Sequence, residues 1–195
     1  MKTSILASEY EDVKKIGDVY IVHLDKKNVE DNMIECYECC VTEEPNIQVL
    51  NEELTEWKTY MSAKELAKAK MLKIDEVTAY DSSDAVNSFD IVMGGQTITT
   101  WITPDKRADY ALSIESAKKL QMTEVTPVFN GVPVTISIEL ADLALAQIQI
   151  YANRCYNVTE QHKAAINALT SVSAVEAYDY TAGYPSKLIF NLDAE

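Results

Sequence analysis

Arginine is scarce in this chain, and Arg107 and Arg154 are its only two examples. Lysine and arginine together number 17, against 31 aspartates and glutamates, so the formal net charge is −14. A surface of this charge repels phosphate backbones. The lysines also alternate with acids and form no basic stripe, so we expect no nucleic-acid partner.

Long apolar runs are also missing, since none approaches the roughly 20 residues that span a bilayer. The first residues carry one lysine followed by acids, which does not resemble a secretory signal. We therefore expect no membrane insertion and folding in a cytoplasm. In that setting the four cysteines should be reduced thiols.

No motif for nucleophilic or phosphate chemistry is visible. His23 lies in an apolar, strand-like run, His162 is predicted in the first turn of a helix, and neither has a triad-like neighbour. Gly94-Gly95 is followed by a second strand-like run, where a phosphate-binding loop needs a helix. We expect no catalytic residue and no cofactor, so the chain is predicted not to be an enzyme.

Cysteine chemistry is the strongest competing interpretation. Cys36 and Cys39 form a Cys-x-x-Cys pair that Cys40 follows directly. A redox pair needs a lowered thiol pKa, yet the flanks are strand-like and acidic and favour the neutral thiol. A structural zinc site needs a second ligand pair, and the remaining His and Cys residues are scattered. We therefore predict no metal, and small apolar roles for these cysteines.

One phrase occurs twice, as Val77-Thr-Ala-Tyr-Asp81 and as Val175-Glu-Ala-Tyr-Asp179. Each copy follows an amphipathic stretch, and each leads into a short apolar, strand-like segment. Each copy of the repeat therefore predicts a helix, an acidic turn and a strand. This is a feature of architecture and not of catalysis.

The N-terminal part, residues 1–50, is predicted to be β-rich. Residues 18–24 and 33–41 are strand-like and could pair as an antiparallel hairpin or meander, with a polar turn at 25–28. Residues 51–74 show helical spacing, with Asn51 as a plausible N-cap. This connecting helix could be continuous or broken near Ser62.

Residues 75–195 are predicted to repeat a hairpin and a helix. Paired turn residues, Gly94-Gly95 and Asn130-Gly131, each stand between two strand-like runs. Thr103-Pro104 should begin a helix that ends near Leu120. Helices at 138–156 and at 159–169, the latter capped by Thr159, should precede a final strand. The predicted fold class is α+β, with small antiparallel β hairpins alternating with helices.

Tyrosine is abundant, with eleven residues against three phenylalanines. Tyrosine suits interfaces because it combines apolar area with a hydroxyl group. A second interpretation, half-buried tyrosines under a small sheet, is equally open. The predicted interface residues are Tyr80, Phe89, Trp101, Tyr178, Tyr180 and Tyr184.

Three stretches form a recognisable set with Trp101 and Arg107: Tyr80–Phe89, Cys155–Ile166 and Tyr178–Pro185. The set resembles proteins of phages and prophages of gut Bacteroidetes that carry the DUF4376 domain of unknown function. The resemblance covers residues 66–190, and no catalytic residues belong to its pattern.

Proteins with this domain are found among tail, tail-fibre and fibre-assembly genes. The resemblance implies a non-enzymatic structural protein of a phage tail or tail fibre, assembled in the host bacterial cytoplasm and located in the virion. Its partners would be other tail or fibre proteins, and it would be an oligomer. Two alternatives stay open: a tail-fibre assembly chaperone absent from the mature virion, and, more remotely, a small carboxylate-based hydrolase.

Overall fold

The computed structural model describes residues 1–29 and 32–193. Its contacts divide the chain into two units, Met1–Glu65 and Leu66–Glu195. The helix α1 (Ile47–Asp81) contains the boundary between them, whereas the three predicted segments placed boundaries near residues 50 and 74. Each unit contains both helix and strand, which confirms the predicted α+β class.

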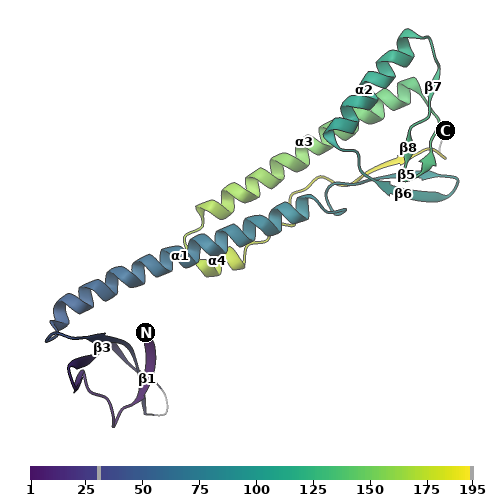
Figure 1. Ribbon diagram of the computed structural model, residues 1–195. Coiled ribbons are helices and arrows are strands. Elements are labelled where there is room, and N and C mark those ends of the chain that lie inside the picture. The colour runs from purple at the N-terminus through teal and green to yellow at the C-terminus, as the bar shows by residue number, and fades with distance from the viewer. Residues whose placement is uncertain (30–31, 194–195) are drawn as a thin grey trace. The chain divides into compact units, whose positions relative to one another are not determined.

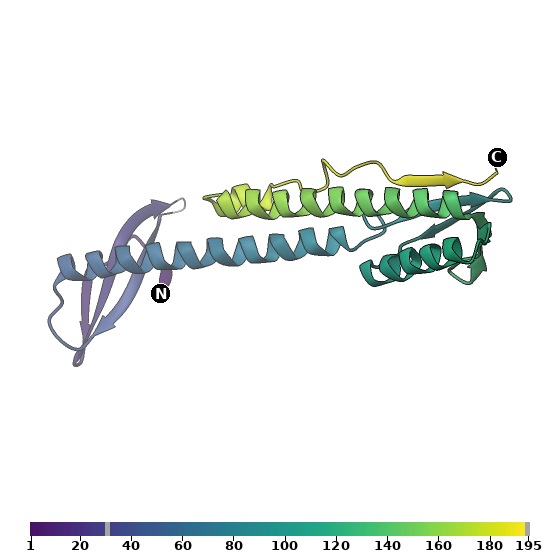
Figure 2. The same cartoon turned by 90° about the horizontal axis from the view of Figure 1, so that it is seen from above.

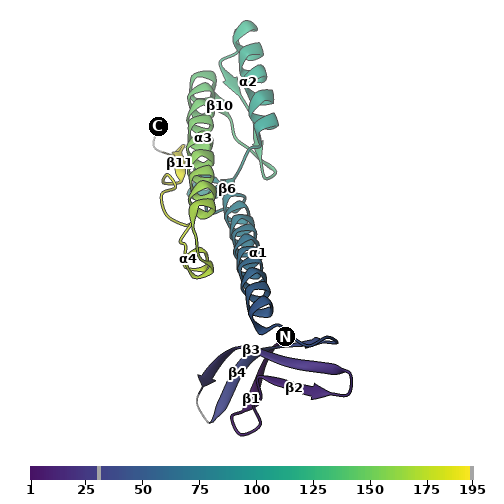
Figure 3. The ribbon, with the colours of Figure 1, turned by 90° about the vertical axis from the view of Figure 1, so that its left-hand side faces the viewer.

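The N-terminal unit contains one antiparallel sheet in the order β1-β4-β3-β2 (Figure 3). Its strands are β1 (Lys2–Leu6), β2 (Val13–Ile16), β3 (Val19–Val29) and β4 (Met33–Val41). The predicted antiparallel pairing of 18–24 with 33–41 is confirmed by β3 and β4. The strands β1 and β2 were not predicted.

The polar turn predicted at residues 25–28 is wrong, because β3 continues to Val29. The pairing with β4 shifts between Leu24 and Lys27. Asp25 takes a positive φ of 52° there, a conformation that Asp tolerates better than most residues. The turn-like residues are therefore accommodated as an irregularity within a strand.

The helix α1 begins four residues earlier than the predicted N-cap. Asn46 Oδ1 accepts hydrogen bonds from the N–H groups of Gln48 and Val49, at 3.1 and 3.3 Å. Asn46 is therefore the cap, and the prediction of Asn51 is wrong. The helix is continuous through Ser62, because no glycine or proline interrupts residues 47–81.

The C-terminal unit contains a three-stranded sheet in the order β11-β5-β6 (Figure 1). The strands β5 (Phe89–Met93) and β6 (Gln96–Thr100) form the hairpin predicted around Gly94-Gly95. Both glycines have positive φ values, 59° and 69°, which explains their use in this turn. The predicted final strand is confirmed as β11 (Leu188–Asn191), which pairs in parallel with β5.

The helix α2 (Pro104–Lys119) begins as predicted, since the Thr103 side chain accepts from the N–H of Lys106. A second predicted hairpin is confirmed around Asn130-Gly131, between β8 (Val128–Phe129) and β9 (Val132–Pro133). Outside it, β7 (Glu124–Val125) pairs with β10 (Ile136–Ser137).

The helix α3 (Ile138–Ala168) is a single element where two helices were predicted. Thr159 lies inside it with 2% of its surface exposed, so its prediction as an N-cap is wrong. His162 likewise lies within the helix and not in a first turn. A short helix, α4 (Val172–Glu176), follows, and α3 runs beside the C-terminal part of α1 (Figure 2).

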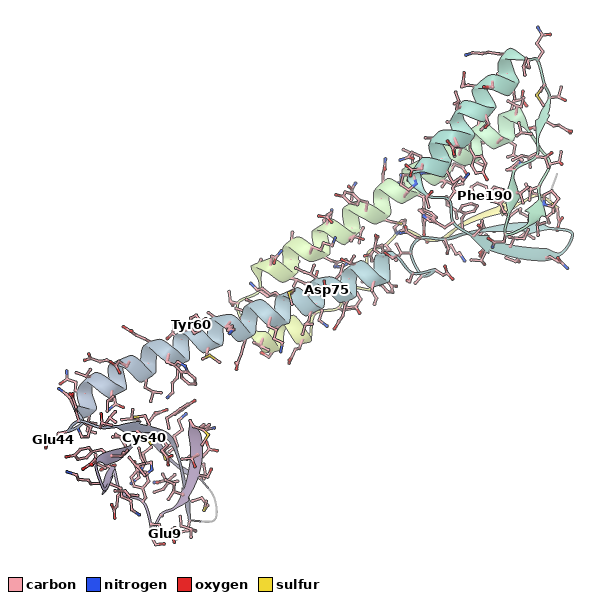
Figure 4. The ribbon with its side chains drawn as sticks, viewed as in Figure 1. Glu9, Cys40, Glu44, Tyr60, Asp75 and Phe190 are labelled. Carbon is pink, nitrogen blue, oxygen red and sulfur yellow. The ribbon has the colours of Figure 1, made fainter. Side chains whose placement is uncertain are left out.

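The main core of the C-terminal unit lies between α3 and the three-stranded sheet. Phe89, Ile91, Ile102 and Ile148 are buried in it, and Phe190 packs against them (Figure 4). Leu120 and Leu143 lie outside this core and are 74% and 57% exposed. Leu120 is the C-cap of α2, so it lies at the end of that helix.

Candidate functional site

The two copies of the repeated phrase meet in space. Val77 begins the first copy and Val175 begins the second, and both are buried against Ile166 of α3. These three side chains are 0%, 1% and 0% exposed. The equivalent valines of the repeat therefore share one core contact.

The strands that follow the two copies also meet. Phe89 at the start of β5 lies opposite Leu188 at the start of β11, and the two strands are parallel. The strands that follow the two copies of the repeat therefore lie side by side and in the same direction. The sequence predicted the units, but it did not predict that they pair with each other.

Four of the predicted interface tyrosines gather where the copies meet, and we call this the tyrosine cluster: Tyr80, Tyr178, Tyr180 and Tyr184 with His162 of α3. The Tyr80 ring lies 5.7 Å from that of Tyr180 and 5.6 Å from that of Tyr184, measured between centroids. His162 lies 5.7 Å from the rings of both Tyr178 and Tyr184. All five side chains are half-buried.

Hydrogen bonds tie this cluster to both copies of the phrase. The Thr159 hydroxyl donates to Asp81 Oδ1 at 2.7 Å. Its single proton is then committed, so the Tyr184 hydroxyl donates to the Thr159 oxygen at 3.0 Å. One buried threonine therefore joins the first copy of the phrase to the segment after the second.

His162 makes the matching connection to the second copy. Its Nε2 lies 2.9 Å from the carbonyl oxygen of Ala182. A carbonyl only accepts, so Nε2 carries the proton. In the neutral ring, Nδ1 then accepts from the Tyr178 hydroxyl, at 2.9 Å.

Burial and local hydrogen bonds shift the pKa values of groups around the cluster. Burial raises the pKa of the Tyr184 hydroxyl and that of the neighbouring Cys155 thiol. The backbone N–H of Thr181 lowers the pKa of the Asp179 carboxyl. These shifts favour neutral Tyr184 and Cys155 and a charged, locally bonded Asp179.

The other two predicted interface residues lie in the adjoining core. Phe89 is 1% exposed and packs against the rings of Trp101, Phe129 and Phe190. It cannot contact a partner while the chain is folded. Trp101 is half-buried and lies under the guanidinium of Arg107.

The cysteines of the N-terminal unit are spread over positions of different exposure on β4. Cys36 is buried, Cys39 is half-buried and Cys40 is exposed. Burial is the main cause that raises the pKa of both Cys36 and Cys39. Across residues 1–29 and 32–193, no three His, Cys, Asp or Glu side chains are grouped to hold a metal.

His23 is held by groups of its own unit. Its Nδ1 lies 2.5 Å from the carbonyl oxygen of Glu11, and its Nε2 lies 3.4 Å from a carboxylate oxygen of Glu38. Its ring also lies against that of Tyr10, at 5.5 Å between centroids. His23 is therefore a packed residue of the sheet with its polar atoms engaged.

Two hollows of the C-terminal unit are apolar. A cavity of about 240 Å³ lies between α2, α3 and the small strands, and its lining includes Tyr110, Ile114 and Phe129. A second hollow lies between α3 and the segment that leads into β11, next to the exposed side chain of Ile150. Such surfaces suit apolar contacts and not acid–base chemistry.

No helix in the described part of the chain is long and apolar enough to cross a membrane. Comparison of the chain with family models, with curated proteins and with solved structures finds no match.

Proposed function

We propose that this chain is a non-enzymatic structural protein of a bacteriophage tail or tail-fibre apparatus. It acts through contacts with other tail or fibre proteins and works as an oligomer. The proposal rests on the resemblance over residues 66–190 together with the structural roles of the residues that carry it.

The tyrosine cluster is the observation that supports this proposal most. The three stretches of the resemblance supply all of its members, and they also supply Thr159, which bonds to Tyr184 of the cluster. The hydroxyl groups of Thr159, Tyr178 and Tyr184 and the ring nitrogens of His162 bond one another or nearby groups of the chain. Residues used in this way maintain a fold, as expected of a shared framework whose function lies on its surface.

The surface of the same unit supports a role in binding. Leu143, Ile150 and Ile189 are 57%, 53% and 64% exposed. Single exposed apolar residues are ordinary, but Ile189 belongs to a strand with one unpaired side in the described sheet, and such strand edges are typical sites of protein contacts. The acidic net charge of −14 also favours protein partners over nucleic acid.

Mass spectrometry of purified virions tests the proposal, using the phage or induced prophage that encodes the chain. We expect peptides of this chain at a fixed ratio to a known tail protein, after washing that removes host cytoplasmic proteins. Its absence from intact particles would reject the structural role.

A tagged copy in infected cells separates the remaining alternatives. If the copy captures unassembled fibre proteins but is missing from particles, the chain is an assembly chaperone. If the purified chain hydrolyses a substrate and loses this activity when a carboxylate is replaced, the non-enzymatic role is wrong.

A further inference from the structure

The strand β11 leaves one side without a neighbour in the described sheet, because the strand order is β11-β5-β6. The N–H of Leu192 donates to the carbonyl oxygen of Val92 on β5, at 2.9 Å. Successive residues of a strand direct their backbone groups to opposite sides. Leu188 and Phe190 therefore bond toward β5, and Ile189 and Asn191 present their N–H and C=O groups to the open side.

The opposite edge of this sheet is covered by the chain itself. The Asn130 side-chain Nδ2 donates to the carbonyl oxygen of Thr99 on β6, at 2.9 Å. The Thr100 hydroxyl lies 3.5 Å from Asn130 Oδ1. The hairpin tip at Asn130-Gly131 thus blocks β6, as proteins commonly protect a sheet edge. The open side of β11 has no such cover in the described residues.

The surface beside β11 continues the open edge onto α3. Ile189 is 64% exposed, and Ile150 of α3 is 53% exposed. A hollow of about 520 Å³ lies on the α3 side of β11, where Ile150, Arg154 and Leu188 help to line it. Ile189 lies on the opposite, exposed face of the sheet. An added strand would contact this flank as well as the backbone of β11.

The sequence of β11 and its flanks is complementary to itself when read in the opposite direction. The segment Lys187–Asp193 reads Lys-Leu-Ile-Phe-Asn-Leu-Asp. An antiparallel copy centred on Phe190 places Leu188 opposite Leu192 and Lys187 near Asp193. The leucine pair and the charged pair then match, whereas a shift of two residues that places Lys187 opposite Asn191 loses the charge match.

The same alignment suits the backbone. It places Ile189 opposite Asn191, and these are the two residues whose N–H and C=O groups point outward. Residues that face each other in this way exchange both hydrogen bonds. Within the chain, Lys187 Nζ lies 2.7 Å from Asp90, and the Asp193 carboxylate accepts from the N–H groups of Gly94 and Gly95. These bonds hold both charged groups on their own sheet, so the paired copies bring opposite charges near each other without a direct bond between them.

We propose that two copies of this chain join through β11 as an antiparallel, two-fold symmetric strand pair centred on Phe190. The two three-stranded sheets become one continuous sheet, and the α3 flanks of both copies are covered. Such an interface closes on itself and gives a dimer, not an open fibre. This inference deepens the proposed function and rests on it, since it names where copies of the oligomer meet.

Light scattering across a concentration series tests the pairing with the full chain. We expect the mass to rise from 21.8 kDa toward twice that value. Ile189→Pro removes an outward N–H and no bond to β5, so it should raise the dissociation constant at least about tenfold. Thr97→Pro is the matched control, because it makes the same change on the covered edge strand β6 and should leave dimerisation unchanged.

Residue-level amide exchange provides a readout that needs no variant. In the dilute chain, the amides of Ile189 and Asn191 should exchange rapidly while that of Phe190, which bonds to β5, is protected. Concentration should slow exchange at Ile189 and Asn191. A chain that stays at 21.8 kDa at every concentration, or protection that appears only when virion proteins are added, would overturn the pairing of two copies.

These outcomes separate the inference from the proposed function. If the chain associates and Ile189→Pro leaves its mass unchanged, the β11 pairing is wrong, but a function through protein contacts stands. If the chain dimerises through β11 yet is absent from virions, the pairing stands and the structural role in the particle fails.

Discussion

The guanidinium of Arg107 lies over the ring of Trp101, with Cζ 5.5 Å from the ring centroid. Arg107 is 8% exposed, although it belongs to the first turn of α2. Its Nη1 donates to the carbonyl oxygen of Ile102 at 2.8 Å, and its Nε donates to Gln149 Oε1 at 2.9 Å. Burial lowers its pKa. One of the two arginines is thus a buried structural residue that links α2 to α3.

Arg107→Lys is expected to lower the free energy of unfolding by about 2 kcal/mol. An ammonium group cannot make both directed bonds and also stack flat on the indole ring. Urea denaturation monitored by circular dichroism gives the measurement. The control, Arg154→Lys at an exposed position of α3, should stay within about 0.5 kcal/mol of the wild type. Equal losses for both variants would contradict a special role for Arg107.

Val77→Ala and Val175→Ala should each destabilise the chain by about 2 kcal/mol. Each removes buried methyl groups and leaves a partial cavity against Ile166. The double variant should deviate from additivity by at least about 0.5 kcal/mol, because both valines contact the same side chain. The measurement is a double-mutant cycle in urea. Val128→Ala, at a position that is 56% exposed, is the control, and full additivity would argue against the shared contact.

Thr159→Val tests the hydrogen bonds that join the two copies of the phrase. It keeps the shape of the side chain but leaves Asp81 without its donor and Tyr184 without its acceptor. We expect a loss of about 1–3 kcal/mol in the free energy of unfolding. Thr159→Ser keeps the hydroxyl and should cost less, so the difference between the two variants isolates the hydroxyl. Identical denaturation midpoints would show that these bonds add nothing.

Asp193 should make the stability of the sheet depend on pH. Its carboxylate accepts from the N–H groups of Gly94 and Gly95, at 2.6 and 3.0 Å, and the bonds from Gly95 and then Gly94 lower its pKa below the usual 3.8. A lowered pKa stabilises the fold above 3.8, and this contribution is lost as the pH falls through the folded-state value.

Asp193→Asn should therefore be less stable than the wild type near pH 7, and the difference should shrink toward pH 2. Thermal melts across this pH range provide the measurement. Asp109→Asn, at an exposed position of α2, should differ from the wild type by little at any pH. A gap between wild type and Asp193→Asn that stays constant down to pH 2 would contradict the assigned charge effect.

Thiol labelling should distinguish the four cysteines. Cys40 is exposed and should react rapidly with a chromogenic disulfide reagent. Cys36 and Cys155 are 1% and 0% exposed, and burial raises the pKa of both thiols, so they should react only when urea unfolds the chain. Cys40→Ser should remove the fast phase alone. Rapid labelling of Cys36 would instead indicate a reactive thiol.

Local chemistry explains which parts of the fold could be predicted. Turn and cap residues determine the backbone conformation of the residues next to them. The predicted turns are therefore present at Gly94-Gly95 and Asn130-Gly131, and the predicted helix start is present at Thr103-Pro104. Pairing between distant segments has no such local signal. The parallel contact of β11 with β5 depends on the packing of α3 between the copies of the repeated phrase.

Errors within helices have a similar cause. Thr159 is a good cap residue in sequence, but no glycine or proline ends the preceding helix, so α3 continues and uses the hydroxyl for Asp81 instead. Met71 fits the helical spacing of Leu54 and Trp57, yet it is 58% exposed. In the C-terminal unit α1 packs through Leu66, which shares this spacing, and through Ala69 and Val77.

The candidate site was predicted in part. Residue type and clustering in sequence identified four tyrosines that do lie together, but the same reasoning chose Phe89, which is buried. Whether these tyrosines contact a partner stays a prediction, as does the role in a phage tail. The open side of β11 was missed, although the self-complementary order of residues 187–193 is visible in the sequence.

The parallel pairing of β5 with β11 also sets the order of events during synthesis. Everything from Gly94 to Lys187 must leave the ribosome before the sheet can gain its third strand. Contacts so distant along the chain form slowly. Until then the β5 edge that β11 will cover is open to other strands, so this unit depends on timely completion, or on a chaperone, to avoid mispairing.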